Sequence, residues 1–324
     1  MNKYMYDLII IGSGPAGLSA AIYATRAQLN TLILEKEVMS GGQVLNTYEV
    51  DNYPGLPGIN GFDMGMKFRE HAEKLGAHFE EDTVLSIETL EESQKELEAA
   101  EVSSKSESGF RIVGENGEYE TKTMVIATGA SHRKLGVDGE ERLVGHGVSY
   151  CATCDGAFFR SKTVVVVGGG DVALEDAIFL ARGSEKVYLI HRRDAFRGAA
   201  VLQKKVMETE NIEVIWDSVV DKIEGENQVE QVQVRNVKTN EVTELPVQGI
   251  FIAVGIQPNT EVFRGFVDMD KQGYIVAGED GKTSTEGVFA AGDARTKMLR
   301  QIVTAASDGA NSVTSVERYL AERG

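Results

Sequence analysis

Residues 6–17 read YDLIIIGSGPAG, and this stretch decides the fold. Its apolar run is too short for a helix and ends in glycines, which is typical of a buried parallel strand. An amphipathic stretch at 18–27 predicts a helix, and an apolar run at 31–34 predicts a second strand. A strand, a glycine turn, a helix and a second strand, in this order, form a unit that binds dinucleotides.

The same pattern occurs a second time in the chain. Residues 163–173 read TVVVVGGGDVA, an amphipathic stretch follows at 173–181, and another apolar run lies at 186–190. A helix is predicted near the C-terminus, at 302–323. Further apolar runs that end in glycine turns lie at 124–129, 250–255 and 288–293. The sequence therefore predicts an α/β fold with two Rossmann-like dinucleotide-binding domains, in agreement with 324 residues at about 150 per domain.

Each glycine of the first turn has a physical task. Gly12 allows a tight turn, Gly14 lets the backbone approach a pyrophosphate, and Gly17 lets the helix pack closely on the strand. The positive end of the helix then holds the pyrophosphate. Because the glycines follow a strand and open a helix, we interpret the turn as a binding site rather than a purely structural turn. The residues predicted to line it are Gly12, Ser13, Gly14, Pro15, Ala16 and Gly17.

The second turn contains Gly168, Gly169 and Gly170, with Ala173 as the small residue at the third glycine position. Asp171 lies inside this turn, where a negative charge opposes a pyrophosphate. We expect the Asp171 side chain to cap the helix that follows, with its charge directed away from the ligand.

The two units differ at the end of their second strands. Glu35 lies 23 residues after Gly12, and His191 lies 23 residues after Gly168. A carboxylate accepts hydrogen bonds from a ribose 2′-hydroxyl and repels a 2′-phosphate, whereas a basic cluster does the reverse. The basic cluster here comprises His191, Arg192, Arg193 and Arg197.

The first site therefore suits FAD or NAD, and the second suits NADPH rather than NADH. A solvated surface cluster is the alternative interpretation of the arginines, but it fits poorly with a chain of net charge −17. Two nicotinamide sites would leave no electron acceptor between them. One FAD site and one NADPH site give a direct path for electrons.

The only cysteines of the chain lie between the two glycine motifs, in the sequence CATCDG at 151–156. The spacing of Cys151 and Cys154 permits a disulfide and favours a reactive thiolate. Asp155 follows directly and can exchange a proton with a nascent thiolate. The alternative is a pair of buried, inert cysteines. No further cysteine or paired histidine completes a zinc site, so we expect no metal.

The composition excludes several classes of function. The net charge of −17 argues against nucleic acid as a partner. No apolar stretch approaches the ~18 residues of a membrane helix, so we expect no membrane partner. Residues 1–7 lack the pattern of a signal peptide, which favours a cytoplasmic location.

Taken together, these motifs make the chain resemble the low-molecular-weight bacterial thioredoxin reductases over residues 8–319. The most specific shared strings are CATCDG at 151–156 and HRRDAFR at 191–197. Supporting strings lie at 12–17, 41–43, 52–55, 127–129, 292–293 and 300–301.

The resemblance implies a discontinuous FAD domain at 1–130 and 258–324, with an NADPH domain inserted at 131–257. It also implies a homodimer that passes electrons from NADPH through FAD and the Cys151/Cys154 dithiol to thioredoxin or a glutaredoxin-like protein. Cys154 would face the flavin, and Asp155 would be the acid–base group. Further residues expected to contact FAD are Gly42, Gln43, Asn52, Thr128, Gly129, Asp293, Arg300, Gln301 and Ile302.

Three other functions remain as alternatives. A reductase of ferredoxin or flavodoxin would lack the dithiol, and a peroxiredoxin reductase would carry extra N-terminal domains. A non-enzymatic NADPH sensor would not need Asp155 after the cysteines. The chain departs from the family pattern at 91–108, where a polar, serine-rich segment predicts an exposed loop or the tip of a long hairpin.

Overall fold

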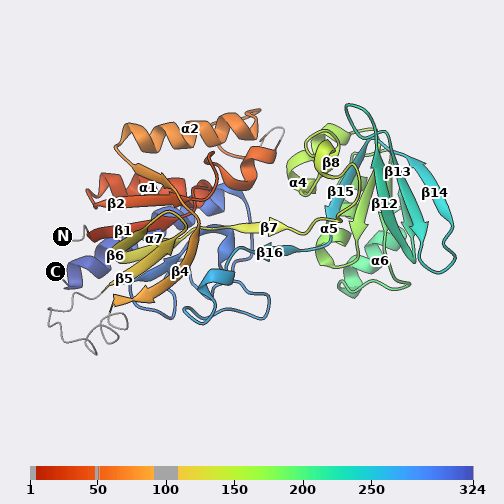
Figure 1. Cartoon of the computed structure of the whole chain (residues 1–324). Helices are drawn as coiled ribbons and strands as arrows, with labels where there is room; N and C mark the ends of the chain where they lie inside the picture. The colour runs from red at the N-terminus through yellow and green to blue at the C-terminus, as the bar shows by residue number, and fades with distance from the viewer. Residues whose placement is uncertain (1–4, 48–49, 51, 91–108, 324) are drawn as a thin grey trace. The chain divides into compact units, whose positions relative to one another are not determined.

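The computed structural model describes residues 5–47, 50, 52–90 and 109–323, so the loop predicted at 91–108 lies outside the described residues. The chain divides into two compact units (Figure 1). The first unit comprises Met1–Leu45, Asn60–Ser131 and Gln257–Gly324, and the second comprises Asn46–Ile59 and His132–Ile256. Strands β7 (Ala130–His132) and β16 (Ile256–Pro258), where the chain passes between the units, pair with each other.

The first unit is built on one mixed sheet in the order β3-β2-β1-β6-β5-β4, with β17 also paired to β6. Strands β1, β2, β3, β6 and β17 pair in parallel, whereas β4 and β5 are antiparallel to their neighbours. Strand β5 pairs with the first half of β6, and β17 pairs with its last residues. The strand bounds are β1 Met5–Ile11, β2 Thr31–Glu35, β3 His78–Glu81, β4 Val84–Thr89, β5 Phe110–Gly114, β6 Glu118–Ile126 and β17 Val288–Ala290.

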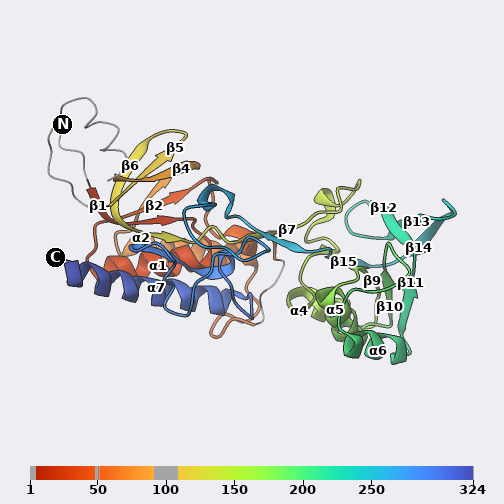
Figure 2. The same ribbon diagram turned by 90° about the horizontal axis from the view of Figure 1, so that it is seen from below.

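The strand β1 is buried on both faces, which explains its continuous apolar run. Leu8 and Ile10 pack with helices α1 (Pro15–Arg26) and α7 (Ile302–Arg323), whereas Ile9 and Ile11 pack on the opposite side with Ile112 and Phe263. Figure 2 shows α1 and α7 side by side along the sheet. Helix α2 (Gly61–Lys74) begins at Asn60, whose side chain accepts a hydrogen bond from the Asp63 backbone N–H. Short 3₁₀ turns lie at η1 Gly42–Asn46, η4 Glu261–Phe263 and η5 Gly292–Ala294.

The second unit contains a parallel sheet in the order β11-β10-β9-β15-β8 and a separate antiparallel sheet, β12-β13-β14. Its helices are α4 (Ala152–Asp155), α5 (Asp171–Ala181) and α6 (Ala200–Glu208), with 3₁₀ turns η2 (Glu141–Leu143) and η3 (Gly156–Phe159). The parallel strands are β8 Val148–Ser149, β9 Thr163–Gly168, β10 Lys186–Ile190, β11 Ile212–Ile215 and β15 Gly249–Ala253. The antiparallel strands are β12 Ser218–Glu224, β13 Gln231–Asn236 and β14 Val242–Pro246.

The predicted α/β fold with two Rossmann-like units is confirmed. The C-terminal helix has the predicted bounds, whereas α1 begins earlier than predicted, at Pro15. This start follows from the fixed φ of proline, which suits the first turn of a helix. No helix in the described ranges is long and apolar enough to cross a lipid bilayer.

The contact between α1 and α7 generates a stability prediction. A Cβ on Gly309 would lie 2.1 Å from the carbonyl oxygen of Ala16. This oxygen belongs to the backbone of α1, so relieving the clash requires the two helices to move apart. We expect Gly309→Ala to lower the free energy of unfolding by about 1–3 kcal/mol. Denaturant unfolding measures this change, and Asn311→Ala, at an exposed position of α7, is the matched control. Equal stability of the two variants would contradict this packing.

Candidate functional site

Two glycines of the first turn are required by the backbone conformation and by close contacts within the protein. Gly12 has φ +100°, and a Cβ there would lie 2.6 Å from the carbonyl oxygen of Ala127. A Cβ on Gly17 would lie 1.8 Å from the carbonyl oxygen of Gly12. These two positions therefore fix the turn between β1 and α1, as the sequence predicts.

Gly14 and Gly170 have no such structural reason to be glycine. Apart from the adjacent residues of the chain, no atom of the described residues lies within 4 Å of a Cβ at either position, and φ is −71° at Gly14 and −96° at Gly170. Both residues are the N-caps of their helices, α1 and α5. A bare backbone at a helix N-terminus lets a phosphate approach the free N–H groups. The two positions therefore fit a dinucleotide in each unit.

Glu35, at the end of β2, is held against the first turn. Its Oε2 accepts hydrogen bonds from the Ser13 backbone N–H and from Ser13 Oγ, both at 2.7 Å. Its Oε1 accepts one from the Glu37 backbone N–H at 3.1 Å. The carboxylate thus lies beside the turn with capacity left for a ribose hydroxyl.

Four buried polar atoms of the first unit have no hydrogen-bond partner among the described residues; one, Arg111 Nε, lies in β5, and the other three follow the parallel strands or precede α7. These three are Thr128 Oγ1, Asp293 Oδ1 and Arg300 Nε. Thr128 follows β6 and Asp293 follows β17, and these parallel strands end level with β1 because Ile126 pairs with both Ile11 and Ala290. Ligands of parallel sheets bind at this edge, and orphaned buried polar atoms are rare unless a ligand completes them. The residues therefore fit the polar groups of a flavin dinucleotide.

Burial raises the pKa of Asp293, while the nearby Lys297 and Arg300 side chains act in the opposite direction. The turn that carries Asp293 is fixed to α7 by Asp308. One Asp308 oxygen accepts hydrogen bonds from the Gly292 backbone N–H at 3.0 Å and from Lys297 Nζ at 2.8 Å. The same carboxylate binds the Arg295 guanidinium through both of its oxygens. Sequence reasoning missed this buried cluster, which holds the turn in place.

The other residues predicted to contact FAD are distributed as follows. Gly42 and Gln43 are exposed in η1, Gly129 follows Thr128 with φ +67°, and Gln301 and Ile302 open α7. Asn52 lies in the segment 46–59, which belongs to the second unit. The first unit therefore does not by itself bring Asn52 together with the other residues predicted to contact FAD.

His191 in the second unit is buried, and its Nε2 lies 3.1 Å from the carbonyl oxygen of Ala195. A Cβ on Gly169 would lie 2.2 Å from the His191 ring, so the imidazole packs directly against the glycine turn. Burial lowers the pKa of His191, and the charges of Arg197 and Arg193 lower it further. The positive charge at this strand end therefore belongs to the arginines rather than to His191.

Arg192, Arg193 and Arg197 are all exposed. The Arg197 backbone N–H donates to the Gly169 carbonyl at 2.8 Å, which ties the arginine segment to the turn. Within the described ranges, none of the three guanidinium groups has an ion-pair or hydrogen-bond partner. Guanidinium groups in this state are available for a phosphate.

The prediction that Asp171 caps its own helix is wrong. Gly170 is the N-cap of α5, and no side chain caps it. Asp171 Oδ1 instead accepts a hydrogen bond of 2.7 Å from the Ala199 backbone N–H, just before α6 begins. The reason is that Asp171 lies one residue too late for its side chain to return to the first N–H groups of α5.

Cys151 and Cys154 form a disulfide at the short helix α4, with 2.07 Å between the two sulfurs. The neighbouring Asp155 accepts a hydrogen bond of 2.6 Å from Ser149 Oγ through Oδ2, whereas its buried Oδ1 has no partner in the described structure. Burial raises the pKa of Asp155, and the Ser149 bond opposes this rise. Such a carboxyl group, half-buried beside a sulfur pair, keeps its proton to a higher pH than an ordinary carboxyl and is suited to exchange it with a sulfur.

Sequence reasoning missed Ser149. Its Oγ also accepts a hydrogen bond from the Cys151 backbone N–H at 3.1 Å, so it links the first cysteine to Asp155. Its position two residues before Cys151 is a weak signal that could have pointed to it.

A family model of pyridine nucleotide-disulphide oxidoreductases matches residues 6–309. The chain is 42% identical to a thioredoxin reductase of Listeria innocua over 99% of this chain and 96% of that protein. It is 41% identical to a thioredoxin reductase of Bacillus subtilis over 99% of this chain and 96% of the relative. The crystal structure of a thioredoxin reductase from Streptococcus pyogenes matches with a TM-score of 0.89 and 42% identity, covering 98% of this chain and 99% of that one.

The two dinucleotide turns and the disulfide define a class, and the chain belongs to the family of pyridine nucleotide-disulphide oxidoreductases. These are flavoprotein oxidoreductases with a redox-active disulfide, and they use FAD and a nicotinamide dinucleotide. Within the family, the chain belongs to the low-molecular-weight thioredoxin reductases. The resemblance inferred from its sequence motifs is thereby confirmed.

The hydrogen bond from Ser149 generates a prediction about pH. Ser149→Ala removes the interaction that favours the ionised Asp155, so we expect the pKa of Asp155 to rise further. Asp155 then keeps its proton to higher pH, and the alkaline limb of the pH profile of disulfide reduction moves upward. Ser149→Thr keeps the hydroxyl and is the matched control. An unmoved limb, or one displaced to lower pH, would argue against this role.

Proposed function

We propose that the protein is an NADPH-dependent thioredoxin-disulfide reductase. Electrons pass from NADPH through FAD to the Cys151–Cys154 disulfide, and from there to the disulfide of thioredoxin or a glutaredoxin-like protein. The observation that carries the proposal is the disulfide itself, with Asp155 beside it, in the same unit as the glycine turn marked by arginines.

The sign of the charge at each ribose supports the assignment of the two nucleotides. Glu35 accepts hydrogen bonds from ribose hydroxyls, which suits FAD, whereas Arg192, Arg193 and Arg197 suit the 2′-phosphate of NADPH. The FAD domain proposed at 1–130 and 258–324 then contains the orphaned polar atoms of Thr128, Asp293 and Arg300. The NADPH domain proposed at 131–257 contains the disulfide.

Bound NADPH supplies a hydride, and bound FAD relays its two electrons to the disulfide. In the chain itself, Cys154 would be the sulfur that accepts electrons from bound FAD, and Cys151 would attack the partner's disulfide as a thiolate. A mixed disulfide forms, Cys154 displaces the partner's sulfur, and the Cys151–Cys154 bond closes again while the partner leaves as a dithiol. Asp155 holds the proton that the leaving thiolate of each exchange requires, because its raised pKa keeps it protonated to a higher pH than an ordinary carboxyl.

Access for a protein partner supports the last step. Thr153, between the two cysteines, is exposed and lines a cavity of about 320 Å³ together with Phe179 and Arg182. We also propose a homodimer, for which the exposed apolar side chains Met298, Leu299 and Phe62 of the first unit are candidate contacts. We propose cytoplasmic operation, since a dithiol that reduces other proteins requires a reducing compartment.

The central prediction concerns Cys154→Ser. The variant has no dithiol, so we expect the reduction of thioredoxin with NADPH to fall by about a thousandfold or more. Binding of FAD and reduction of the flavin by NADPH should persist, because neither turn is altered. The measurement combines a coupled thioredoxin assay with anaerobic spectra of the flavin.

The flavin spectra serve as the internal control of that experiment. A protein that binds no flavin would exclude the proposed function. Thioredoxin reduction that survives in Cys154→Ser would show that the disulfide is not on the electron path.

A second prediction concerns the nicotinamide site. Replacing both arginines, Arg192→Ala with Arg193→Ala, should lower the preference for NADPH over NADH by about ten- to a hundredfold, since each contributes a charge-assisted contact to phosphate. The ratio of kcat/KM for the two coenzymes measures the effect. Arg264→Ala, an exposed arginine of the first unit, is the control. An unchanged ratio would make the arginines a solvated surface cluster.

A further inference from the structure

A chain of hydrogen bonds runs from helix α2 to Glu35 in the first unit. Arg69 Nη1 donates to Ser40 Oγ at 2.8 Å, the Ser40 and Ser13 hydroxyls lie 2.8 Å apart, and Ser13 Oγ bonds Glu35 Oε2 at 2.7 Å. Ser13 is 0% exposed and Ser40 is 2% exposed. Water therefore does not compete for the middle of this chain.

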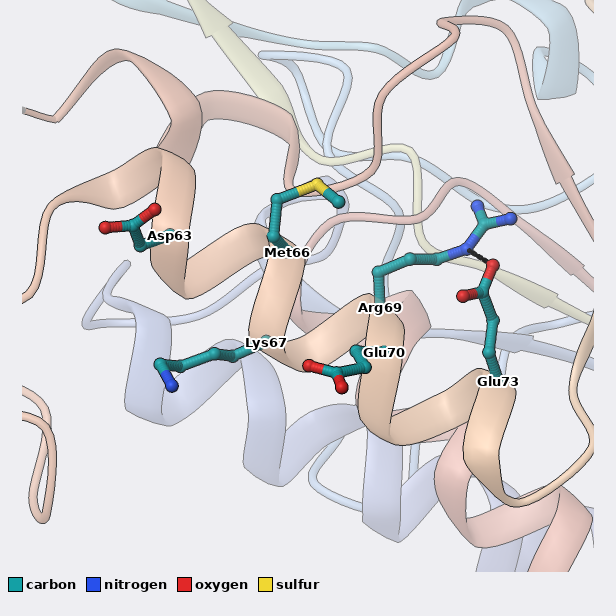
Figure 3. Close-up of a pocket in the computed structure, with 6 residues that line it drawn as sticks. All are labelled: Asp63, Met66, Lys67, Arg69, Glu70 and Glu73. Carbon is teal, nitrogen blue, oxygen red and sulfur yellow. Dashed lines mark hydrogen bonds and ion pairs between the residues drawn. The ribbon is translucent and has the colours of Figure 1, made fainter.

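Arg69 is held rigidly at the outer end. Its Nε donates to Glu73 Oε1 at 2.6 Å, and its guanidinium carbon lies 3.4 Å from the centre of the Phe79 ring. Figure 3 shows Arg69 and Glu73 meeting along α2, at the edge of a surface pocket of about 460 Å³, while Lys67 and Glu70 point away from them. With Nε and the ring face both engaged, Nη1 has a fixed direction toward Ser40.

The hydrogens of this chain have one consistent direction. An arginine only donates and an ionised carboxylate only accepts, so the single hydroxyl hydrogen of Ser13 goes to Glu35. Ser40 accepts from Arg69 and therefore has its own hydrogen free to donate to Ser13. A positive charge at one end and a negative charge at the other polarise both hydroxyls in the same sense, and such chains strengthen each of their bonds.

The chain leaves one defined position open on Glu35. A carboxylate offers about four lone-pair sites. Two sites on Oε2 are taken by Ser13, and one on Oε1 is taken by the Glu37 N–H. The remaining site is on Oε1, and the fixed Ser13 contacts determine where it lies.

We propose that Arg69, acting through Ser40 and Ser13, is a positioning residue that orients Glu35 for the 2′-hydroxyl of the adenosine ribose of FAD. The inference rests on the proposed FAD site and adds to it a device that orients the carboxylate before the nucleotide arrives. Arg69 touches neither the turn nor Glu35 through any bond of its own, and it lies 34 residues after Glu35 in the sequence.

The test is the affinity of the flavin-free protein for FAD and for an FAD analogue with 2′-deoxyadenosine, measured by quenching of flavin fluorescence. The full protein is used after removal of its flavin. We expect Ser40→Ala to weaken FAD binding by about tenfold, the scale of one hydrogen bond to a charged group. Binding of the 2′-deoxy analogue should change little, because that analogue lacks the hydroxyl that Glu35 accepts.

Two further variants separate positioning from a general loss of structure. Arg69→Met replaces the guanidinium with an apolar side chain that can still pack on Phe79, and it should reproduce the effect of Ser40→Ala, with no added loss in the double variant. Glu73→Gln loses the ion pair to Arg69 but keeps the Ser40 bond, and it should bind FAD nearly as well as the unaltered protein.

The outcomes are distinct. Equal weakening for FAD and the 2′-deoxy analogue, or no weakening for either, would overturn the positioning role. If Ser40→Ala does not fold, the same comparison with Arg69→Met decides. An unaltered protein that binds no FAD would instead refute the proposed function.

Discussion

The nucleotide sites proposed in both units depend on two places where a bare backbone meets the start of a helix. A pyrophosphate binds to a helix N-terminus only if no side chain stands between them. Gly14 and Gly170 satisfy this constraint, and no contact among the described residues requires either of them to be glycine. The neighbouring Gly12 and Gly17, by contrast, serve the turn itself. The glycines that packing requires are therefore distinct from those that fit a ligand.

The two turns share a backbone but differ in what supports them. In the first unit the Ser13 side chain fills the turn and bonds Glu35. In the second unit Gly169 has no side chain, and the buried His191 ring fills the equivalent space. One support holds a carboxylate beside the turn, and the other leaves exposed arginines in its place. Under the proposed function, charge at this one position of each strand would determine which nucleotide binds, on otherwise similar scaffolds.

Much of the fold and of the candidate site could be predicted from the sequence, because short local patterns determine these features. The apolar runs, the glycine turns and the contrast between Glu35 and the arginines are readable within a few residues. Contacts between distant elements were not readable. Asp171 bonds Ala199, Asp308 fixes Gly292, and Arg69 reaches Ser40, each across 16 to 29 residues without any periodic signature. The antiparallel sheet β12–β14 was not predicted either, although β13 alternates polar residues with the buried Val232 and Val234.

The central claim is that one chain connects a nicotinamide site to a disulfide through a flavin. An anaerobic titration of the isolated protein with NADPH, followed by the flavin spectrum and by counting free thiols, tests it most directly. The account predicts uptake of about two equivalents per chain, because the flavin and the disulfide each accept one electron pair, with both cysteines becoming free thiols. Reduction that stops after about one equivalent, with Cys151 and Cys154 still joined, would contradict it.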